Sequence, residues 1–486
     1  MKSTVSTSYN LVGQKNLEKN KKVLVIAYFF PPTGGVASAA AQRTLKLVRY
    51  MPSFGWQPVI LTARECKYES YIDMDATLLE KVPKELEIHR STVMRGIGFL
   101  LRLRKKILNF ITVKRSSPED GFEGRPKNQS TATPIAPEKI SRYAAFKNAI
   151  TDLFQIPDEQ VGWLIPAIIL GRKILKKNDF DVIFATGKPW TSHMIGLVLS
   201  FLTKRPLVTE FQDPWTTNPF KPKYSFIKTW FENRLEQLSV KRSSLVIITT
   251  KELKNEFISR FPEQLAEKFL YLSNCYDPVD IPKELPPKYS EDVFTLLHLG
   301  YLYVKRDPRN FLLGLRIALD EGWIDKGHIK FLQVGTVSDD FCLEPFIEEN
   351  SLGEVVELRG QVPLQVSLET LWQADCLLLL QPGTSTQMPS KLFEYIITGQ
   401  PILAISPKNS AVWKFSLENS LGSVADADNP REIAKVLAEF YTAWRNKDSS
   451  KQISPDVLHR YSAISITAEL AKNMDAISVD PAIKYK

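Results

Sequence analysis

The sequence predicts an α/β protein made of two doubly wound parallel-sheet domains that face each other across a cleft. Continuous apolar runs of strand length alternate with helical stretches along most of the 486 residues, which is typical of sheets covered on both faces. A proline-rich connector over 275–287 divides this alternation, and each half opens with a strand that ends in a glycine-containing loop. With 44% hydrophobic residues, the chain can form two cores.

The first half opens on an apolar strand, 23–30, followed by the loop Pro31-Pro32-Thr33-Gly34-Gly35. A helix over about 38–54 and a strand over 58–62 complete a βαβ unit. The glycine loop therefore lies at the carboxyl end of a strand, where open α/β sheets bind ligands. Gly34 and Gly35 are candidates for close approach to a substrate, and the alternative is a tight turn that needs glycine for geometry alone. No G-x-G-x-x-G or G-x-x-x-x-G-K-[ST] sequence is present, which argues against dinucleotide-binding and P-loop enzymes.

Two later strands of the first half, 181–186 and 206–211, also end in polar loops. The first loop leads to His193 at the start of a helix, and the second contains Gln212 and Asp213. Because the carboxyl ends of parallel strands meet at one sheet edge, we expect these side chains to lie close together as candidate catalytic groups. The alternatives are that the Asp-Pro pair forms a turn or helix cap, and that the histidine is satisfied locally.

The second half begins with a strand over 294–299 and a loop that carries Lys305 and Arg306. Both cations are candidates for binding an anion, unless they form only a solvated basic turn. Further strands are expected at 329–334, 355–358, 376–380 and 402–405, and the strand at 329–334 ends at Gly335.

A short helix after Ser390 combines several features of a phosphate and sugar site. Ser390 is a good N-cap, and free backbone N–H groups together with the helix dipole favour an anion at this end. Lys391 adds a positive charge, and Glu394 can accept hydrogen bonds from a sugar diol. We expect Lys391, Glu394 and Tyr395 to share the polar face, opposite Leu392. The alternative is a surface helix in which Glu394 only complements the dipole.

Charge is concentrated in the segment 95–115, which has seven cations and no acidic residue in a chain of net charge +9. Apolar residues recur there at helical spacing, a pattern of helices that lie on anionic membranes. The alternative is an ordinary amphipathic helix that packs on its own domain. The segment has no stacking platform for bases, so we expect no nucleic-acid partner.

The remaining features of the sequence concern disordered segments, the cellular location of the protein and its cysteines. We expect residues 1–20 to form a disordered tail and 116–140 a mobile loop inside the first domain. The start of the chain lacks the apolar centre of a signal peptide, and no apolar run approaches the roughly 20 residues of a spanning helix. A cytoplasmic protein, peripheral on the inner face of the plasma membrane, is therefore expected. The four cysteines show no metal-binding or disulfide spacing: Cys66, Cys275, Cys342 and Cys376.

Several of these motifs resemble those of family 4 glycosyltransferases, which are retaining enzymes of the GT-B fold with two Rossmann-like domains. Residues 389–403 are similar to the donor-binding signature P-S-K-L-x-E-Y-x-x-x-G-x-P-I-L. Residues 157–163, 186–193 and 211–215 are similar to the P-D-x-x-x-x-W, T-G-x-P-x-S-x-H and F-R-D-P-W segments of one subgroup. The motifs occur in the family's order over about 21–444.

The resemblance implies a nucleotide diphosphate sugar as donor and roles for individual residues. Asp213, Gln212 and His193 would be the catalytic candidates on the acceptor side. Glu394 would contact the nucleotide ribose. The other donor-binding candidates are Gly34, Gly35, Lys305, Arg306, Gly335, Thr386, Ser390, Lys391 and Leu392. Three positions depart from the family pattern: Thr386 replaces a glutamate, while Tyr301 and Gln212 each replace an arginine.

The function implied is retaining transfer of a sugar, of hexosyltransferase type, to a hydroxyl of a glycan or polyprenyl-linked oligosaccharide in polysaccharide biosynthesis. No metal or other cofactor is expected. The alternatives are a GT-B sugar-nucleotide epimerase and a non-catalytic scaffold protein of a polysaccharide assembly complex. The expected domains are 21–285 on the acceptor side and 286–450 on the nucleotide-sugar side, with 451–486 returning to the first.

Overall fold

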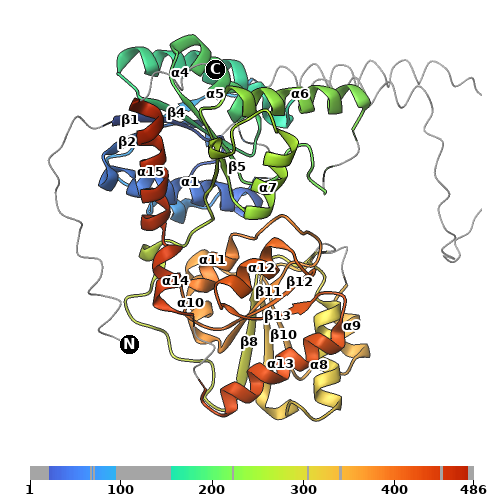
Figure 1. The fold of residues 1–486 in the computed structure, drawn as a ribbon. Coiled ribbons are helices and arrows are strands. Elements are labelled where there is room, and N and C mark those ends of the chain that lie inside the picture. Colours follow the sequence, from blue (N-terminus) through green and yellow to red (C-terminus); the bar gives the residue numbers. More distant parts are fainter. Residues whose placement is uncertain are drawn as a thin grey trace, which may run out of the picture.

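The computed structural model describes residues 21–65, 68, 72–94, 155–219, 221, 224–303, 306–338, 342–448 and 453–479. Within these ranges the chain forms two α/β domains, one above the other in Figure 1, each built on a parallel sheet. No helix in these ranges is both long and apolar enough to cross a bilayer.

The first domain has a parallel sheet whose strands lie in the order β3-β2-β1-β4-β5-β6-β7. The strands are β1 (Lys21–Ile26), β2 (Trp56–Ala63), β3 (Glu87–Ser91), β4 (Val182–Gly187), β5 (Leu207–Phe211), β6 (Leu245–Ile248) and β7 (Phe269–Tyr271). The helices around it are α1 (Ser38–Tyr50), α4 (Leu164–Lys177), α5 (Thr191–Thr203), α6 (Phe226–Arg242), α7 (Lys251–Arg260) and α15 (Ala463–Val479).

The second domain has a parallel sheet in the order β10-β9-β8-β11-β12-β13. The strands are β8 (Phe294–Leu299), β9 (Ile329–Val334), β10 (Val356–Arg359), β11 (Cys376–Leu380), β12 (Ile402–Ser406) and β13 (Gly422–Asp426). The helices are α8 (Arg309–Asp320), α9 (Glu344–Glu349), α10 (Leu364–Gln373), α11 (Lys391–Ile396), α12 (Ala411–Glu418), α13 (Pro430–Arg445) and α14 (Pro455–Arg460).

The continuous apolar runs form strands because both faces of each sheet are covered. In β1, Val23 and Val25 pack into a core with α1 and α15. The alternate residues Leu24 and Ile26 pack into a second core with α4 and α5. A strand that is buried on both faces has apolar residues at successive positions, without polar alternation. The two parallel sheets covered on both faces confirm the fold class that these apolar runs predicted.

Local sequence signals set the helix boundaries. The side chains of Ser225, Thr250 and Asn429 accept hydrogen bonds from the first turns of α6, α7 and α13, which stabilises each helix by about 1 kcal/mol. The helix expected over 38–54 is α only to Tyr50 and continues as a 3-10 helix, in which Pro52 lacks a backbone donor. The first strand was expected to run to residue 30 but stops at Ile26, before the chain turns at 31–32.

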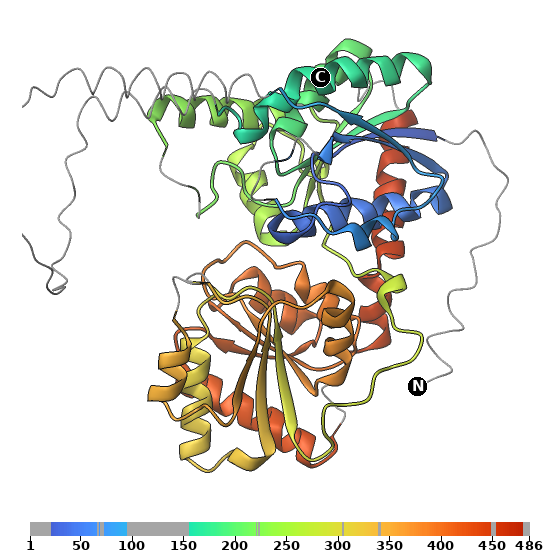
Figure 2. The ribbon, with the colours of Figure 1, turned by 180° about the vertical axis from the view of Figure 1, so that it is seen from behind.

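The chain passes between the domains twice. The first sheet ends at Tyr271 and the second begins at Phe294. Near the end of the chain, α14 packs on the second domain, whereas α15 packs against α1 of the first. Figure 2 shows these two helices running from one domain to the other. The exact boundaries expected at 285 and 450 stay predictions.

Candidate functional site

A pocket of about 620 Å³ lies between the domains, where the carboxyl ends of both sheets meet. The first domain contributes the ends of β4 and β5 and one side of α6. The second contributes the loops after β8 and β11. The lining residues used below are Asp158, Lys188, Trp190, Asp213, Trp215, Lys228, Glu232, Tyr303, Arg306 and Gln387.

On the side of the second domain, Arg306 lines the pocket and interacts electrostatically with Lys391, which is not itself a lining residue. Lys391 is held at the end of β8. Its Nζ donates a hydrogen bond to the carbonyl of Leu299 at 3.0 Å, at the end of β8. A Cβ atom on Gly300 would collide with this Nζ, and one on Gly335 would collide with the carbonyl of Gly300. Gly300 and Gly335 also have φ values of +145° and +128°, which favour glycine. The structure thus brings Lys391 against the end of β8, where neither Gly300 nor the adjacent Gly335 has room for a side chain.

Arg306 is a second cation close to Lys391. Burial lowers the pKa of Lys391 to about 8, an effect that Glu394 opposes and Arg306 reinforces. The Nε of Arg306 is buried and has no hydrogen-bond partner among the described residues. Each of the two cations disfavours the positive charge of the other, and the Nε of Arg306 has an unused N–H donor. An anion bound here would relieve the repulsion and accept that hydrogen bond. We call Gly300, Arg306, Gly335, Lys391 and Glu394 the Lys391 cluster.

The pKa of Lys391 predicts a pH dependence. Lys391 is protonated below about pH 8 in the free protein, so binding a diphosphate requires a proton once the pH exceeds that value. We expect donor affinity to fall by about tenfold per pH unit above this point. Calorimetry at several pH values measures it. Lys391→Arg, which keeps its charge throughout, is expected to give a flatter profile, and an equally steep profile in that variant would contradict the assignment.

A buried polar pair positions the Gly300 loop. His298 and Gln333 face each other on β8 and β9, with 2.6 Å between Nδ1 and Oε1, and the Gln333 amide donates to the carbonyl of Gly300 at 2.7 Å. Burial, Lys391 and Arg306 lower the pKa of His298 to about 3, so its ring is neutral. This pair was not predicted from the sequence. The available signal was one polar residue next to the last position of each of two apolar strands.

The short helix α11 differs in part from expectation. Ser390 occupies the N-cap position, as predicted, but it has helical backbone angles and its side chain makes no cap hydrogen bond. Tyr395, expected on the polar face, is buried, and its hydroxyl accepts a hydrogen bond from the backbone N–H of Leu299 at 2.9 Å. Leu392 is buried, as its apolar face predicts, so only its backbone could face a ligand.

Glu394 is half-buried and faces the first domain. Burial by itself would lower the pKa of Lys46 on α1, but the pKa is raised, and Glu394 is the largest of the charges responsible. The carboxylate therefore lies near the boundary between the domains.

The opposite wall presents Asp213. Its Oδ1 accepts a hydrogen bond from the Gln387 amide of the second domain at 2.9 Å, and its Oδ2 lies 3.7 Å from Lys188 Nζ. Beside it, Trp190 and Trp215 stack with 4.9 Å between ring centroids. Asp213 therefore faces the pocket and links the two domains.

Gln212 points into a buried network instead of standing free. Its amide donates to Thr186 Oγ1 at 2.9 Å and to Glu210 Oε2 at 3.0 Å. Glu210 in turn forms a buried ion pair with Arg43 at 2.8 Å, and Arg43 also donates to the carbonyls of Leu272 and Ser273. This network fixes the end of β5. Arg43 and Glu210 were not predicted as part of the site, because helix and strand periodicity alone would make both positions apolar.

Asp158 was also not predicted as a site residue, although it belongs to the P-D-x-x-x-x-W segment. Its carboxylate accepts hydrogen bonds from the backbone N–H of Thr191 at 2.9 Å and from its hydroxyl at 2.6 Å. Burial raises the pKa of Asp158 to about 6. The residue holds the start of α5 at the edge of the pocket.

His193 is fully buried and does not line the pocket. Its Nε2 lies 3.0 Å from the carbonyl of Glu210, and its ring packs on Trp190, Phe211 and Trp215. Burial lowers its pKa to about 4. The catalytic role of His193 stays a prediction, and this placement favours a structural role instead.

A His193→Gln variant separates the two roles. The unfolded histidine binds a proton below its ordinary pKa of 6.5, whereas the folded one does so only below about 4. Stability is therefore expected to fall as the pH drops through this window, by roughly 2 kcal/mol between pH 7 and pH 5. Urea unfolding at both pH values is expected to show a smaller fall in the variant. An unchanged fall would contradict a buried neutral ring, and a collapse of turnover with donor binding intact would support catalysis.

The remaining predicted residues are dispersed. Gly35 has φ of +54°, and a Cβ there would collide with Asp73, so the glycine loop packs against residues 73–75. Neither Gly34 nor Gly35 is part of the pocket lining. The carbonyl of Thr386 accepts a hydrogen bond from the Thr250 hydroxyl at 2.8 Å, joining the domains. Lys305, the basic segment 95–115 and the loop 116–140 lie outside the described residues.

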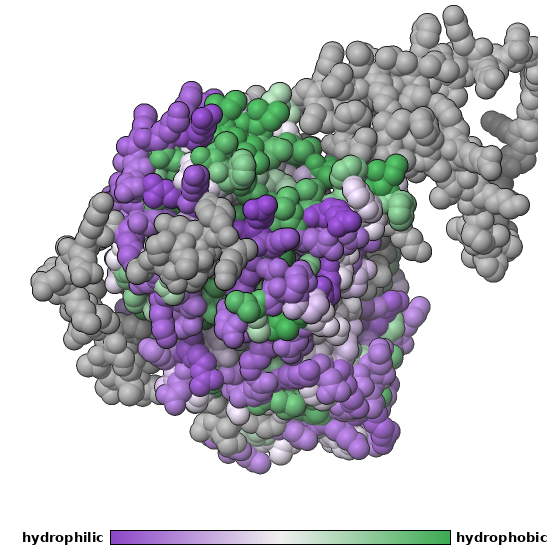
Figure 3. Space-filling model, turned by 45° about the horizontal axis from the view of Figure 1, so that its top comes forward, coloured by the Kyte–Doolittle hydropathy of each residue, from purple (hydrophilic) through white to green (hydrophobic). Residues whose placement is uncertain are grey.

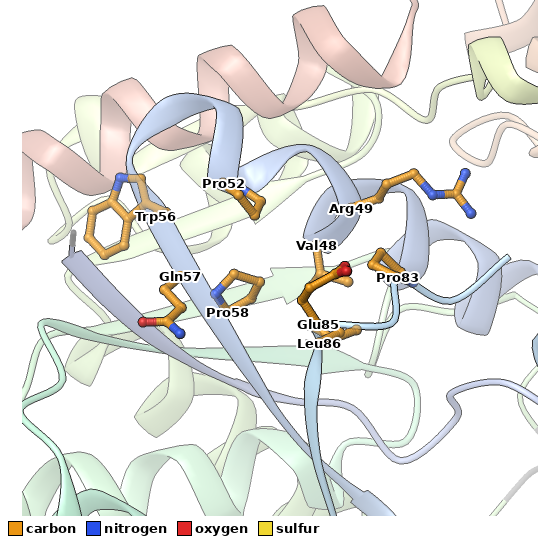
Figure 4. Close-up of a pocket in the computed structure, with 9 residues that line it drawn as sticks. All are labelled: Val48, Arg49, Pro52, Trp56, Gln57, Pro58, Pro83, Glu85 and Leu86. Atoms are coloured by element: carbon orange, nitrogen blue, oxygen red, sulfur yellow. The ribbon is translucent and has the colours of Figure 1, made fainter. Parts of the chain in front are cut away.

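Two further observations concern the rest of the described chain. No group of three or more His, Cys, Asp or Glu residues in it is placed to hold a metal ion. A separate pocket of about 460 Å³ lies near the amino end of β2, between Trp56, Pro58 and Leu86 (Figure 4). Arg49 at its rim is paired with Asp277. No predicted site residue lines this pocket.

Solved structures with a similar fold are known, although no protein-family model and no curated protein matches the sequence. Anabaena HepE in complex with UDP and glucose is 14% identical, with a TM-score of 0.57 over 94% of this chain and 100% of that one. The lipopolysaccharide-biosynthesis glycosyltransferase WaaG is 14% identical, with a TM-score of 0.53 over 94% and 100%. A candidate UDP-N-acetylglucosamine 2-epimerase from Listeria monocytogenes is 11% identical, with a TM-score of 0.53 over 95% and 98%. Identities this low show the fold alone, and the chain therefore has the GT-B fold.

Proposed function

We propose that the protein is a retaining family 4 glycosyltransferase of hexosyltransferase type. It would move a sugar from a nucleotide diphosphate sugar to a hydroxyl of a glycan or polyprenyl-linked oligosaccharide in polysaccharide biosynthesis. One observation carries the proposal: Arg306 lines the interdomain pocket on one side, with Lys391 close to it, and the carboxylate of Asp213 lines the other side. The fold, shared with HepE bound to UDP and glucose, supports it.

The proposed reaction depends on stabilising the negative charge that develops on the leaving group. When the bond from sugar to diphosphate breaks, negative charge grows on the departing phosphate, and Lys391 and Arg306 would stabilise it. Fixed cations in a partly buried site need little reorganisation during the reaction. Glu394 would hold the ribose, and we propose that no metal ion is needed. Loss of activity on chelation, restored by a divalent ion, would contradict this part.

Asp213 would orient the attacking hydroxyl and accept its hydrogen bond. The side chain is already held by Gln387 at 2.9 Å, so its position depends on how the two domains meet. A polyprenyl-linked acceptor would place the enzyme at the cytoplasmic face of the plasma membrane. The predicted basic segment 95–115 is consistent with that location.

The test begins with calorimetric binding of a panel of nucleotide diphosphate sugars. Any donor that binds is then incubated with and without a lipid-linked acceptor, and the products are analysed. Release of the nucleoside diphosphate that depends on acceptor, with the anomeric configuration retained, is the expected result. Conversion of the donor without acceptor would indicate an epimerase, an alternative that the fold of the Listeria protein favours. Binding without turnover on any acceptor would indicate the scaffold alternative.

A further inference from the structure

Three helices of the first domain, α4, α5 and α6, share an exposed apolar surface. We call this surface the α4–α6 face and define it by Ile165, Ile169, Phe201, Leu202, Phe226 and Trp230. Phe201 is 75% and Phe226 is 83% exposed. Figure 3 shows hydrophobic side chains gathered at the end of the molecule where Figure 1 places these helices. Side chains this large are seldom left in water together unless they bind something.

Helix α6 is amphipathic with its polar side buried and its apolar side exposed. Phe226 and Trp230 are one turn apart on its outer side. The inner side carries polar residues, and Lys228, Glu232 and Glu236 are all buried. The apolar side therefore faces outward, and the polar side faces the interior and the pocket.

The charges around the face have one sign. Exposed cations are numerous on α4 and α6: Arg172, Lys173, Lys176, Lys177, Arg234, Lys241 and Arg242. The acidic residues of the three helices are Glu232 and Glu236, which are buried and paired with Lys221 and Arg260. Asp179, just after α4, is paired with Arg205 at 2.6 Å. The exposed charges of the three helices are thus all positive.

We propose that the α4–α6 face docks on an anionic lipid surface. Aromatic and aliphatic side chains would enter the interfacial region, and the surrounding cations would contact lipid headgroups. A second copy of the chain fits poorly, because a two-fold contact would set this cationic surface against itself. The basic segment 95–115 fits poorly for the same reason, since it has seven cations and no acidic residue.

Docking would place the pocket beside the bilayer. Lys228 and Glu232 on the inner side of α6 line the pocket, and Phe226 and Trp230 lie on its outer side. One helix therefore separates the lipid surface from the reaction site. This consequence, unlike docking itself, rests on the proposed function: a lipid-linked acceptor could reach the pocket without leaving the membrane.

The test is sedimentation of the full chain with vesicles, compared between phosphatidylglycerol-containing and pure phosphatidylcholine vesicles. We expect binding to the anionic vesicles that weakens with added salt. A triple variant, Phe201→Ser, Phe226→Ser and Trp230→Ser, is expected to bind at least roughly tenfold more weakly.

The matched control replaces three exposed apolar residues away from this face, Leu285→Ser, Val366→Ser and Leu417→Ser. It is expected to bind as the unaltered protein does. Melting temperatures of both triple variants that equal the melting temperature of the unaltered protein establish that their folds are intact. A charge variant, Lys173→Gln, Lys176→Gln and Lys177→Gln, is expected to lose the preference for anionic vesicles.

Three outcomes would overturn the proposal. The first is undiminished vesicle binding by the α4–α6 triple variant. The second is binding lost only when cations of the segment 95–115 are neutralised. The third is a dimer in sedimentation velocity that the triple variant abolishes and vesicles do not dissociate. Vesicle binding is measured without donor, so a protein that docks but transfers no sugar would contradict the proposed function and leave the docking surface standing.

Discussion

Lys391→Ala is expected to weaken the binding of a nucleotide diphosphate sugar by roughly tenfold to a hundredfold, the usual effect of losing a charged hydrogen-bond donor. The reason is the position of Lys391, whose Nζ lies at the end of β8 beside Arg306, in a partly buried site. Burial already disfavours the charge of this lysine. Its removal is therefore expected to leave the melting temperature unchanged or slightly raised.

Calorimetry with the donor identified in the panel measures the effect. Lys408→Ala is the matched control, because Lys408 is an exposed lysine of the same domain that pairs with Asp426 and Glu432. Glu394→Ala is also expected to weaken donor binding, through the ribose. Unchanged donor affinity in both Lys391→Ala and Glu394→Ala would show that the donor does not bind at the Lys391 cluster.

Asp213→Asn is expected to lower turnover by roughly two to four orders of magnitude while donor affinity changes little. Asparagine keeps the shape and can still accept the hydrogen bond from Gln387. It loses the negative charge that would orient the acceptor hydroxyl and take up its proton. A loss confined to turnover would therefore reflect chemistry, and not a displaced side chain.

Steady-state kinetics with the lipid-linked acceptor, together with donor calorimetry, separates the two quantities. Asp428→Asn serves as the control, because Asp428 is an exposed aspartate distant in sequence from the pocket lining. Turnover within a few-fold of the unaltered enzyme would show that Asp213 only links the domains. In that case Asp158, which also lines the pocket, becomes the next carboxylate to test.

Candidate site residues could be proposed from the sequence where a single short stretch contained several features of a binding site. Lys391 and Glu394 were predicted because a cation, a carboxylate and a helix start fall within five residues, and their role stays a prediction. The same spacing predicted Tyr395 on the outside, but the structure buries it under β8, where its hydroxyl binds the backbone of Leu299. The spacing of residues along a helix shows which side chains share one side of it. It does not show what other part of the protein packs against that side.

The residues missed are those whose partners are distant in the chain. Arg43 and Glu210 form an ion pair in which both side chains are almost completely buried. A buried charge is stable only when its partner is close, and no local pattern gives the partner of Arg43, 167 positions away. His193 is a different case: a polar loop suggested chemistry, and the structure packs the histidine among aromatic rings, which favours a structural role, while the catalytic role stays a prediction.

By itself, the sequence determined the class of two parallel-sheet α/β domains, because apolar runs, caps, glycines and prolines act over distances of a few residues, and the family resemblance implied the GT-B fold. It also determined which loops end at the edge of each sheet. Only the tertiary structure decided which of those loops meet. The pocket, the contact between Gln387 and Asp213, and the outward apolar side of α6 all depend on how segments far apart in the chain pack, and packing is set by shape and burial over the whole molecule.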